Sequence, residues 1–151
     1  MKAMVLNSTD EVAPADIRRP AAESGATLVR VSHSGICGTD LKIFHGAIPV
    51  RHPLVMGHEM IGDAVEGKSI GPRIIVDPVY FCGSCYLCRH DQAHLCTNGG
   101  LFGRDRDGGF AEYFAAPPGS VYELPDDIGG EAPLLQVLTT CLHGHRLAQI
   151  F

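Results

Sequence analysis

Short segments of strand-forming residues, separated by turn residues, make up most of the chain. Polar and apolar positions partly alternate in several of them, which predicts strands with one buried face. The predicted strands cover residues 26–33, 55–65, 73–77 and 109–114, and Pro117-Pro118 ends the last one. Many short strands punctuated by 18 Gly and 10 Pro predict a mainly β fold, either a barrel or a sandwich.

Two helices are predicted beside these strands. The first is short and starts near Thr39 or Asp40, either of which can cap it. The second lies within residues 131–149, where Pro133 suits the first turn. Helical spacing predicts an apolar face made of Leu134, Leu135, Leu138, Leu142 and Leu147. The fold class is therefore β-rich α+β.

Composition and charge exclude several classes of function. A chain of 151 residues with 45% hydrophobic and 19% charged residues is long enough to bury one core. A net charge of −5 gives no basic surface for nucleic acid or an anionic membrane. No apolar run reaches the roughly 18 residues of a membrane span. The apolar N-terminal stretch is too short for a secretion signal, so we expect a cytoplasmic protein.

Four of the six cysteines lie within residues 82–96. Cys82, Cys85, Cys88 and Cys96 have the spacing C-x2-C-x2-C-x7-C. Thiolates at this spacing can converge on one ion, and four of them complete a closed tetrahedral site that suits Zn²⁺. Such a site is structural, and by analogy with zinc peptides it contributes on the order of 10 kcal/mol to ordering its lobe.

Three alternatives compete with structural zinc at these cysteines. Buried free thiols would be scattered along the chain. The bacterial iron–sulfur run places its fourth cysteine sooner and follows it with proline, whereas Cys96 is followed by Thr97. A nucleic-acid zinc ribbon would pair two separate C-x2-C turns and carry basic residues, and this segment has only Arg89 against Asp91. The spacing favours structural zinc.

A second candidate metal site lies upstream. Cys37 is part of Gly-Ile-Cys-Gly-Thr-Asp at 35–40, and His58 is part of Gly-His-Glu at 57–59. Each side chain is in a turn that contains glycine, at the end of or within a predicted strand, where a loop can present it to a cleft. A Cys and a His with a third ligand and a water form the open coordination of catalytic zinc.

Four motifs occur in order along the chain. They are GICGTD, GHE, the four-cysteine spacing and GGFAEY at 108–113. Together they resemble the N-terminal, GroES-like catalytic domain of the zinc-dependent medium-chain dehydrogenases, which include alcohol, sorbitol, threonine and glucose dehydrogenases. The resemblance implies a GroES-like, partly open β-barrel over residues 1–151, with a structural zinc lobe at 80–100.

The resemblance also implies roles for individual residues. Cys37 and His58 resemble ligands of the catalytic zinc, and Glu59 resembles a nearby carboxylate that can serve as an alternative ligand. Asp40 resembles the acid that accepts a hydrogen bond from the zinc-bound histidine, and Thr39 resembles the hydroxyl that takes the substrate's proton. The structural zinc ligands would be Cys82, Cys85, Cys88 and Cys96.

At other positions the chain departs from the family or allows two interpretations. Gln136 stands where relatives carry Cys, Asp or Glu, so it is either a weak, neutral third zinc ligand or simply a polar residue of a helix face. Thr140 resembles a residue that hydrogen-bonds the nicotinamide, while Cys141 is expected to pack. Lys42 replaces a histidine that passes the proton to solvent in many relatives. Lys42 and His45 are each a proton exit or a surface residue.

The implied function is oxidation of a small alcohol, polyol or sugar by hydride transfer to NAD(P)⁺, with one catalytic and one structural zinc. No G-x-G-x-x-G follows a strand, so a Rossmann domain is absent from the 151 residues. With the abrupt apolar end at Ile150-Phe151, this predicts a fragment that is inactive alone and belongs to a homo-oligomeric enzyme.

Two other classes compete with the dehydrogenase interpretation. A stand-alone zinc-binding or protein-interaction module would explain the departure at Gln136, but it has no need of Cys37, Thr39 and His58 together. A zinc-free quinone reductase of the same superfamily would lack both metal motifs. Elemental analysis separates these interpretations, because the full interpretation requires two zinc ions per chain, the structural lobe alone requires one, and iron would overturn the metal assignment.

Overall fold

A computed structural model of the chain describes residues 1–22, 25–67 and 71–149. The chain-terminal Ile150 and Phe151 lie outside the described residues. The elements in chain order are β1 (Lys2–Ser8), β2 (Glu11–Asp16), β3 (Thr27–Gly35), α1 (Gly38–Phe44), β4 (Leu54–Val55), β5 (Glu59–Gly67), β6 (Arg73–Val76), β7 (Val79–Tyr80), α2 (Tyr86–Arg89), the 3-10 helix η1 (Ala93–Leu95), β8 (Gly100–Leu101), β9 (Tyr113–Ala116), β10 (Val121–Glu123) and α3 (Leu134–Ala148).

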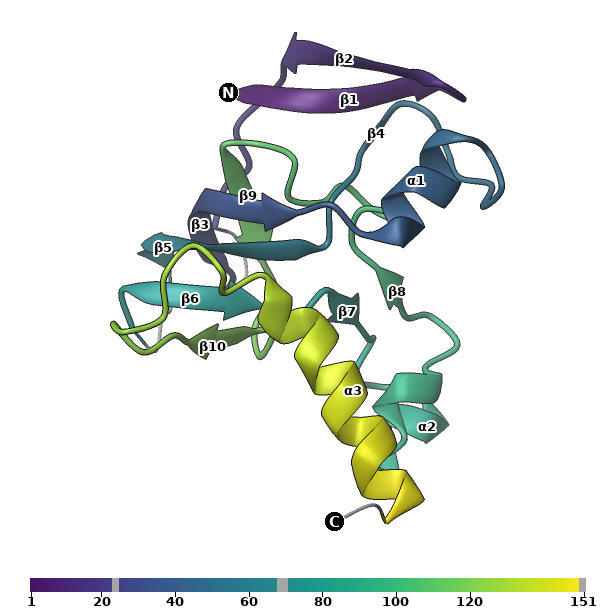
Figure 1. Ribbon diagram of the computed structural model, residues 1–151, viewed down its shortest axis with the longest axis vertical. Coiled ribbons are helices and arrows are strands. Elements are labelled where there is room, and N and C mark those ends of the chain that lie inside the picture. Colours follow the sequence, from purple (N-terminus) through teal and green to yellow (C-terminus); the bar gives the residue numbers. More distant parts are fainter. Residues whose placement is uncertain (23–24, 68–70, 150–151) are drawn as a thin grey trace.

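Antiparallel sheets dominate the structure (Figure 1). The largest has the strand order β10-β6-β5-β3-β9, a second has the order β2-β1-β4, and β7 pairs with β8. Within the described residues these sheets do not close into a barrel. The mainly β, partly open architecture predicted from the sequence is confirmed.

The predicted strands are confirmed in part. Residues 26–33 and 73–77 correspond to β3 and β6. The predicted strand at 55–65 is two strands, because Gly57 has a φ of +89° and interrupts the extended chain between β4 and β5. The prediction for 109–114 is wrong at its start: residues 109–112 form no strand, and β9 begins at Tyr113.

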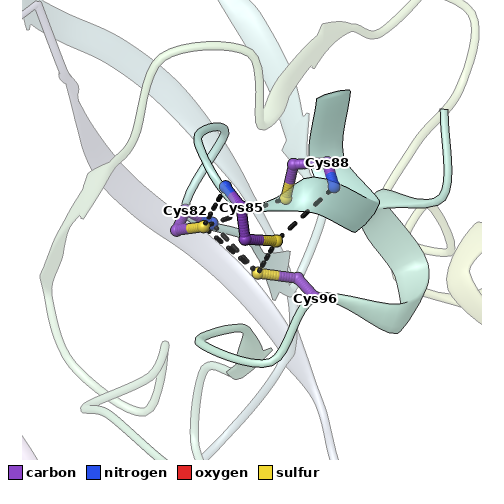
Figure 2. A group of neighbouring side chains, drawn as sticks. All are labelled: Cys82, Cys85, Cys88 and Cys96. Carbon is purple, nitrogen blue, oxygen red and sulfur yellow. Dashed lines mark hydrogen bonds between the residues drawn. The ribbon is translucent and has the colours of Figure 1, made fainter. Parts of the chain in front are cut away.

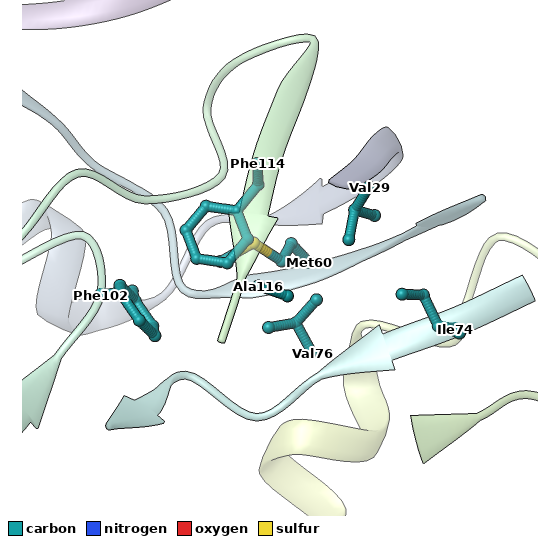
Figure 3. Close-up of a cluster of buried hydrophobic side chains, with 7 residues drawn as sticks. All are labelled: Val29, Met60, Ile74, Val76, Phe102, Phe114 and Ala116. Carbon is teal, nitrogen blue, oxygen red and sulfur yellow. The ribbon is translucent and has the colours of Figure 1, made fainter. Parts of the chain in front are cut away.

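The main core lies on the five-stranded sheet. Apolar side chains from β3, β5, β6 and β9 meet there, together with Phe102, which follows β8 (Figure 3). Its buried members are Val29, Met60, Ile74, Val76, Phe102, Phe114 and Ala116. A second cluster packs Ile43 of α1 against Leu6 of β1 and Leu54 of β4, with Met56 beside them. This second cluster fixes α1 next to the chain segment that leads to His58.

Both helices exist, but each differs from its prediction. The N-cap of α1 is Cys37 rather than Thr39 or Asp40, because the Asp40 side chain reaches back to accept a hydrogen bond from the Cys37 amide at 2.8 Å. In α3, Leu135 alone of the expected leucine face packs on a buried cluster. The other four leucines are exposed, with exposed fractions of 64% for Leu134, 49% for Leu138, 58% for Leu142 and 71% for Leu147.

Two glycine-to-alanine substitutions are expected to have opposite effects on stability. A methyl group at Gly62 of β5 would overlap the backbone carbonyl of Arg30 on β3, so Gly62→Ala should destabilise the protein by about 1–3 kcal/mol. Gly144 lies within α3 with open space around it, so Gly144→Ala should stabilise by up to about 1 kcal/mol. Urea unfolding of both variants measures the difference, and effects of the same sign would contradict the packing around Gly62.

Candidate metal centres

Antiparallel pairing brings Cys37 and His58 together where β3 ends and β5 begins, at one end of these neighbouring strands. In the register of β3 and β5, Gly35 lies opposite Glu59. Cys37 follows the end of β3 by two residues, and His58 directly precedes β5. One ligand atom each from Cys37, His58 and Glu59 lies within 4.8 Å of the other two. The structure therefore brings together three residues that the resemblance places at a catalytic metal.

The Asp40 carboxylate connects the two turns that carry Cys37 and His58. Its Oδ2 accepts a hydrogen bond from the Cys37 amide at 2.8 Å, and its Oδ1 accepts one from the Gly57 amide at 3.2 Å. Asp40 is 2% exposed, so these are hydrogen bonds to a buried acid. Sequence comparison gives Asp40 a role toward the histidine alone. Its bond to Gly57, a residue distant in the chain, leaves no signal in the sequence.

His58 is buried and turns one ring nitrogen toward this acid. Its Nδ1 lies 3.5 Å from Asp40 Oδ1 and has no hydrogen-bond partner among the described residues. Interaction with the Asp40 carboxylate raises the pKa of His58 from 6.5 to about 9, although burial acts in the opposite direction. With Nδ1 directed at Asp40, Nε2 is the nitrogen available to a metal ion. The thiol, imidazole and carboxylate donors fit Zn²⁺.

Glu59 owes its position to a glycine on the neighbouring strand. The Glu59 side chain is buried, and its carboxylate occupies the space that a side chain at Gly35 would need. Any larger residue at position 35 would displace this carboxylate from the edge of the sheet. The glycine of the GICGTD motif therefore makes room for the acid of the GHE motif.

The remaining predicted residues of this site lie at different places. Gln136 of α3 donates a hydrogen bond from Nε2 to the carbonyl of Val76 at 2.6 Å, at the edge of the sheet where β5 begins. Thr39 is half-buried in α1, and Thr140 is exposed on α3. Lys42 is exposed, and His45 Nδ1 lies 2.6 Å from Asp10 Oδ1. Among the described residues, neither Lys42 nor His45 hydrogen-bonds to Thr39. Cys141 is exposed, so the expectation that it packs is wrong.

Four sulfurs converge in the cysteine lobe (Figure 2). The Sγ atom of Cys82 lies 3.5 Å from that of Cys96 and 3.9 Å from that of Cys88, and Cys85 Sγ lies 3.9 Å from Cys96 Sγ. Four thiolates around one zinc, with bonds of about 2.3 Å, would lie about 3.8 Å apart. The spacing of the sulfurs therefore fits a tetrahedral ion.

Backbone amides of the lobe donate hydrogen bonds to the sulfurs. The amide of Cys85 donates to Cys82 Sγ at 3.3 Å, and the amide of Cys88 donates to Cys85 Sγ at 3.5 Å. Hydrogen bonds from Ser84 lower the pKa of Cys82 to about 5, whereas desolvation and the neighbouring thiols raise the pKa of Cys88 to about 12. A divalent cation among the sulfurs would favour the thiolate form of all four.

Comparison with known proteins identifies the class of this fold and site. The family model of the alcohol dehydrogenase GroES-like domain matches residues 23–126. The chain belongs to this family, the N-terminal domain of the medium-chain dehydrogenases. The resemblance drawn from the four motifs is confirmed.

The similar proteins include a named dehydrogenase. The chain is 36% identical over 136 residues to L-threonine 3-dehydrogenase of Pyrococcus furiosus, covering 83% of this chain and 38% of that protein. It is 33% identical over 138 residues to the starvation-sensing protein RspB of Escherichia coli, covering 87% of this chain and 41% of that protein. The chain thus spans less than half the length of these relatives.

Solved structures give the same class. A zinc-binding dehydrogenase of Sinorhizobium meliloti bound to NADP superposes with a TM-score of 0.88 at 36% identity, over 97% of this chain and 45% of that one. Galactitol-1-phosphate dehydrogenase of Escherichia coli superposes with a TM-score of 0.88 at 30% identity, over 99% of this chain and 45% of that one. Within residues 1–22, 25–67 and 71–149, no helix combines the length and apolar character that crossing a membrane requires.

Proposed function

We propose that this chain is the catalytic-domain part of a zinc- and NAD(P)-dependent dehydrogenase that oxidises an alcohol, polyol or sugar hydroxyl to a carbonyl. The observation that carries the proposal is the meeting of Cys37, His58 and Glu59 at one edge of the sheet. A scaffold without chemistry has no use for a thiol, an imidazole and a carboxylate at this spacing. Membership of the family and its dehydrogenase relatives support the same function.

In this proposal Cys37 and His58 hold the catalytic zinc, with Glu59 or Gln136 as a further ligand. The zinc supplies a Lewis acid, which lowers the pKa of a hydroxyl group just as it brings that of bound water to about 7. Asp40 holds the imidazole of His58 in one orientation through Nδ1 and favours binding through Nε2. Thr39, two residues after Cys37 in the same turn, accepts the substrate's proton. Lys42, His45 or neither of them then passes the proton to solvent.

The cysteine lobe at 80–100 serves a different purpose in this proposal. Cys82, Cys85, Cys88 and Cys96 hold a second zinc with no position left for a substrate, so this metal stabilises the lobe. The three short sulfur–sulfur distances, of 3.5, 3.9 and 3.9 Å, support this assignment. We therefore assign residues 1–151 to one GroES-like domain with a zinc-bound lobe.

Hydride transfer also requires a nucleotide site, which we place in the part of the protein beyond this domain. The relatives are more than twice as long as this chain, and one of the similar structures contains NADP. Thr140, exposed on α3, is proposed to hydrogen-bond the nicotinamide once that part is present. We expect the 151 residues alone to show no NAD(P)-dependent alcohol oxidation and the whole enzyme to be a homo-oligomer. NAD(P)-dependent alcohol oxidation by the isolated chain would contradict the placement of the nucleotide site outside these 151 residues.

Metal analysis of the intact protein tests the proposal directly. We expect two zinc ions per chain, and His58→Ala should reduce this to one because the imidazole is a ligand of one ion only. His33→Ala is the matched control, since His33 is exposed and belongs to neither candidate site. Inductively coupled plasma mass spectrometry gives the count. Two zinc ions in the His58→Ala protein would overturn the assignment of the catalytic site.

A further inference from the structure

A second loop packs directly on the turn that carries His58. Residues 107–110, called here the clamp segment, lie between β8 and β9. Its amides donate to the carbonyls of residues 55–57: Gly108 to Val55 at 2.7 Å, Gly109 to Gly57 at 2.8 Å and Phe110 to Met56 at 2.9 Å. In return, the Val55 amide donates to Asp107 Oδ1 at 2.9 Å. These hydrogen bonds hold the residues that immediately precede His58.

Steric contacts restrict the same turn. Gly57 has a φ of +89°, and the Phe110 ring lies over it so closely that a Cβ at position 57 would be 2.7 Å from Phe110 Cε1. The backbone of Gly108 lies against the Gly57 carbonyl, and a side chain at Gly103 would meet that carbonyl at 2.7 Å. The turn therefore has no space to move toward the clamp segment.

The opposite side of the turn is held by α1. The Gly57 amide donates to the buried Asp40 carboxylate at 3.2 Å. The clamp segment bonds to the carbonyl groups of the turn, while Asp40 bonds to its amide, so the two contacts use different atoms of Gly57. A residue fixed from both sides in this way presents its neighbour, His58, in one direction.

We propose that the clamp segment is a positioning element for His58 and that Phe110 is its principal positioning residue. This inference rests on the proposed function, in which His58 binds zinc. Phe110 is not one of the candidate ligands, which are Cys37, His58 and Glu59. It acts by keeping Gly57 in its left-handed conformation, so that the imidazole is already directed at the metal before the ion binds. Groups that hydrogen-bond directly to a metal ligand typically change metal affinity by about 10–100-fold. Phe110 acts one residue further away, through Gly57, so we expect an effect near the lower end of that range.

The test is the zinc affinity of each site in the intact Phe110→Ala protein, measured by competition with a chromogenic chelator. We expect affinity at the site of Cys37 and His58 to fall by about tenfold or more, while that of the cysteine lobe stays within about twofold. After cobalt substitution, the visible bands of the His58 site should also shift, because the imidazole meets the metal at a different angle. Unchanged affinity with an unchanged cobalt spectrum would overturn the proposal.

Two further variants make the outcome specific. Leu124→Ala removes a buried side chain from another cluster, so it should lower stability without changing zinc affinity. An equal loss of affinity in Leu124→Ala would reduce the effect of Phe110 to general destabilisation and overturn the proposal. His58→Ala is the reference variant. If His58→Ala retains both zinc ions at full affinity, the proposed function is refuted as well. If His58→Ala loses one zinc ion while Phe110→Ala keeps full affinity, only the role of Phe110 is refuted.

Asp107 keeps the proposal testable if the Phe110→Ala protein does not fold. Asp107→Ala removes the acceptor for the Val55 amide and should weaken zinc binding at the His58 site. Asp107→Asn keeps an oxygen at the same place and should restore it. Equal affinities in the alanine and asparagine variants would contradict a positioning role for the clamp segment.

Discussion

Cys85→Ser is expected to release the metal from the cysteine lobe and to unfold residues 80–100. The Cys85 sulfur lies 3.9 Å from Cys96 Sγ and accepts a hydrogen bond from the Cys88 amide, so it is one of the four donors of the cluster. The lobe has almost no buried apolar side chains of its own, since α2 and η1 contain no buried residue. Structural zinc contributes about 10–16 kcal/mol in comparable peptides, and this lobe has no other source of that order.

Cys141→Ser is the matched control for this prediction. Cys141 is exposed on α3 and belongs to neither candidate metal site, so the same chemical change there should alter neither zinc content nor stability. Zinc analysis combined with amide hydrogen exchange over residues 80–100 distinguishes the two variants. Full zinc content and protected amides in Cys85→Ser would show that the lobe does not depend on a metal.

Asp40→Ala is expected to disorganise the His58 site and to destabilise the domain by about 2–5 kcal/mol, because two amides lose their acceptor where water replaces it poorly. The amides are those of Cys37 and Gly57, at 2.8 and 3.2 Å from the carboxylate. His58 would also lose the acid that faces its Nδ1, so zinc affinity at that site should fall by about 10–100-fold. Denaturant unfolding and zinc titration measure the two effects.

Asp63→Ala provides the contrasting acid. Asp63 makes an exposed salt bridge with Arg30 at 2.7 Å, and such pairs contribute about 0–1 kcal/mol. Asp40→Asn is the conservative partner, because one oxygen remains as an acceptor, and we expect it to lose less stability than Asp40→Ala. If Asp40→Ala changed the free energy of unfolding and the zinc affinity as little as Asp63→Ala, the bridging role of the buried carboxylate would be refuted.

The sequence predicts the strands of the large sheet better than those of the smaller one. The strands β3 and β6 contain runs of β-branched and apolar residues, and alternation identifies them. The strand β2 contains Pro14, which argues against a strand and is tolerated here because β2 is the edge of its sheet. In β1, burial alternates from Lys2 to Val5, but the exposed Met4 is itself apolar, so the sequence shows no alternation of polar and apolar residues.

The metal motifs are visible in the sequence, but the meeting of Cys37 with His58 follows only from the family resemblance and not from the spacing of residues. The register that places Gly35 opposite Glu59 depends on pairing between distant segments, and spacing within each motif says nothing about it. The four cysteines are different, because all their contacts are local. The leucines of α3 show the limit of periodicity: it identifies the helix correctly, yet it does not say that most of these side chains remain exposed in this chain.

The contacts of Gly57 determine where this domain can be altered by protein engineering. Its amide, its carbonyl and its α-carbon face three different neighbours: Asp40, the clamp segment and the Phe110 ring. A substitution in Asp40, the clamp segment or Phe110 should therefore change the position of His58. Random mutagenesis should find few tolerated changes at these residues. Exposed positions such as Ile36 and Leu41, which flank the Cys37 turn, should tolerate substitution better.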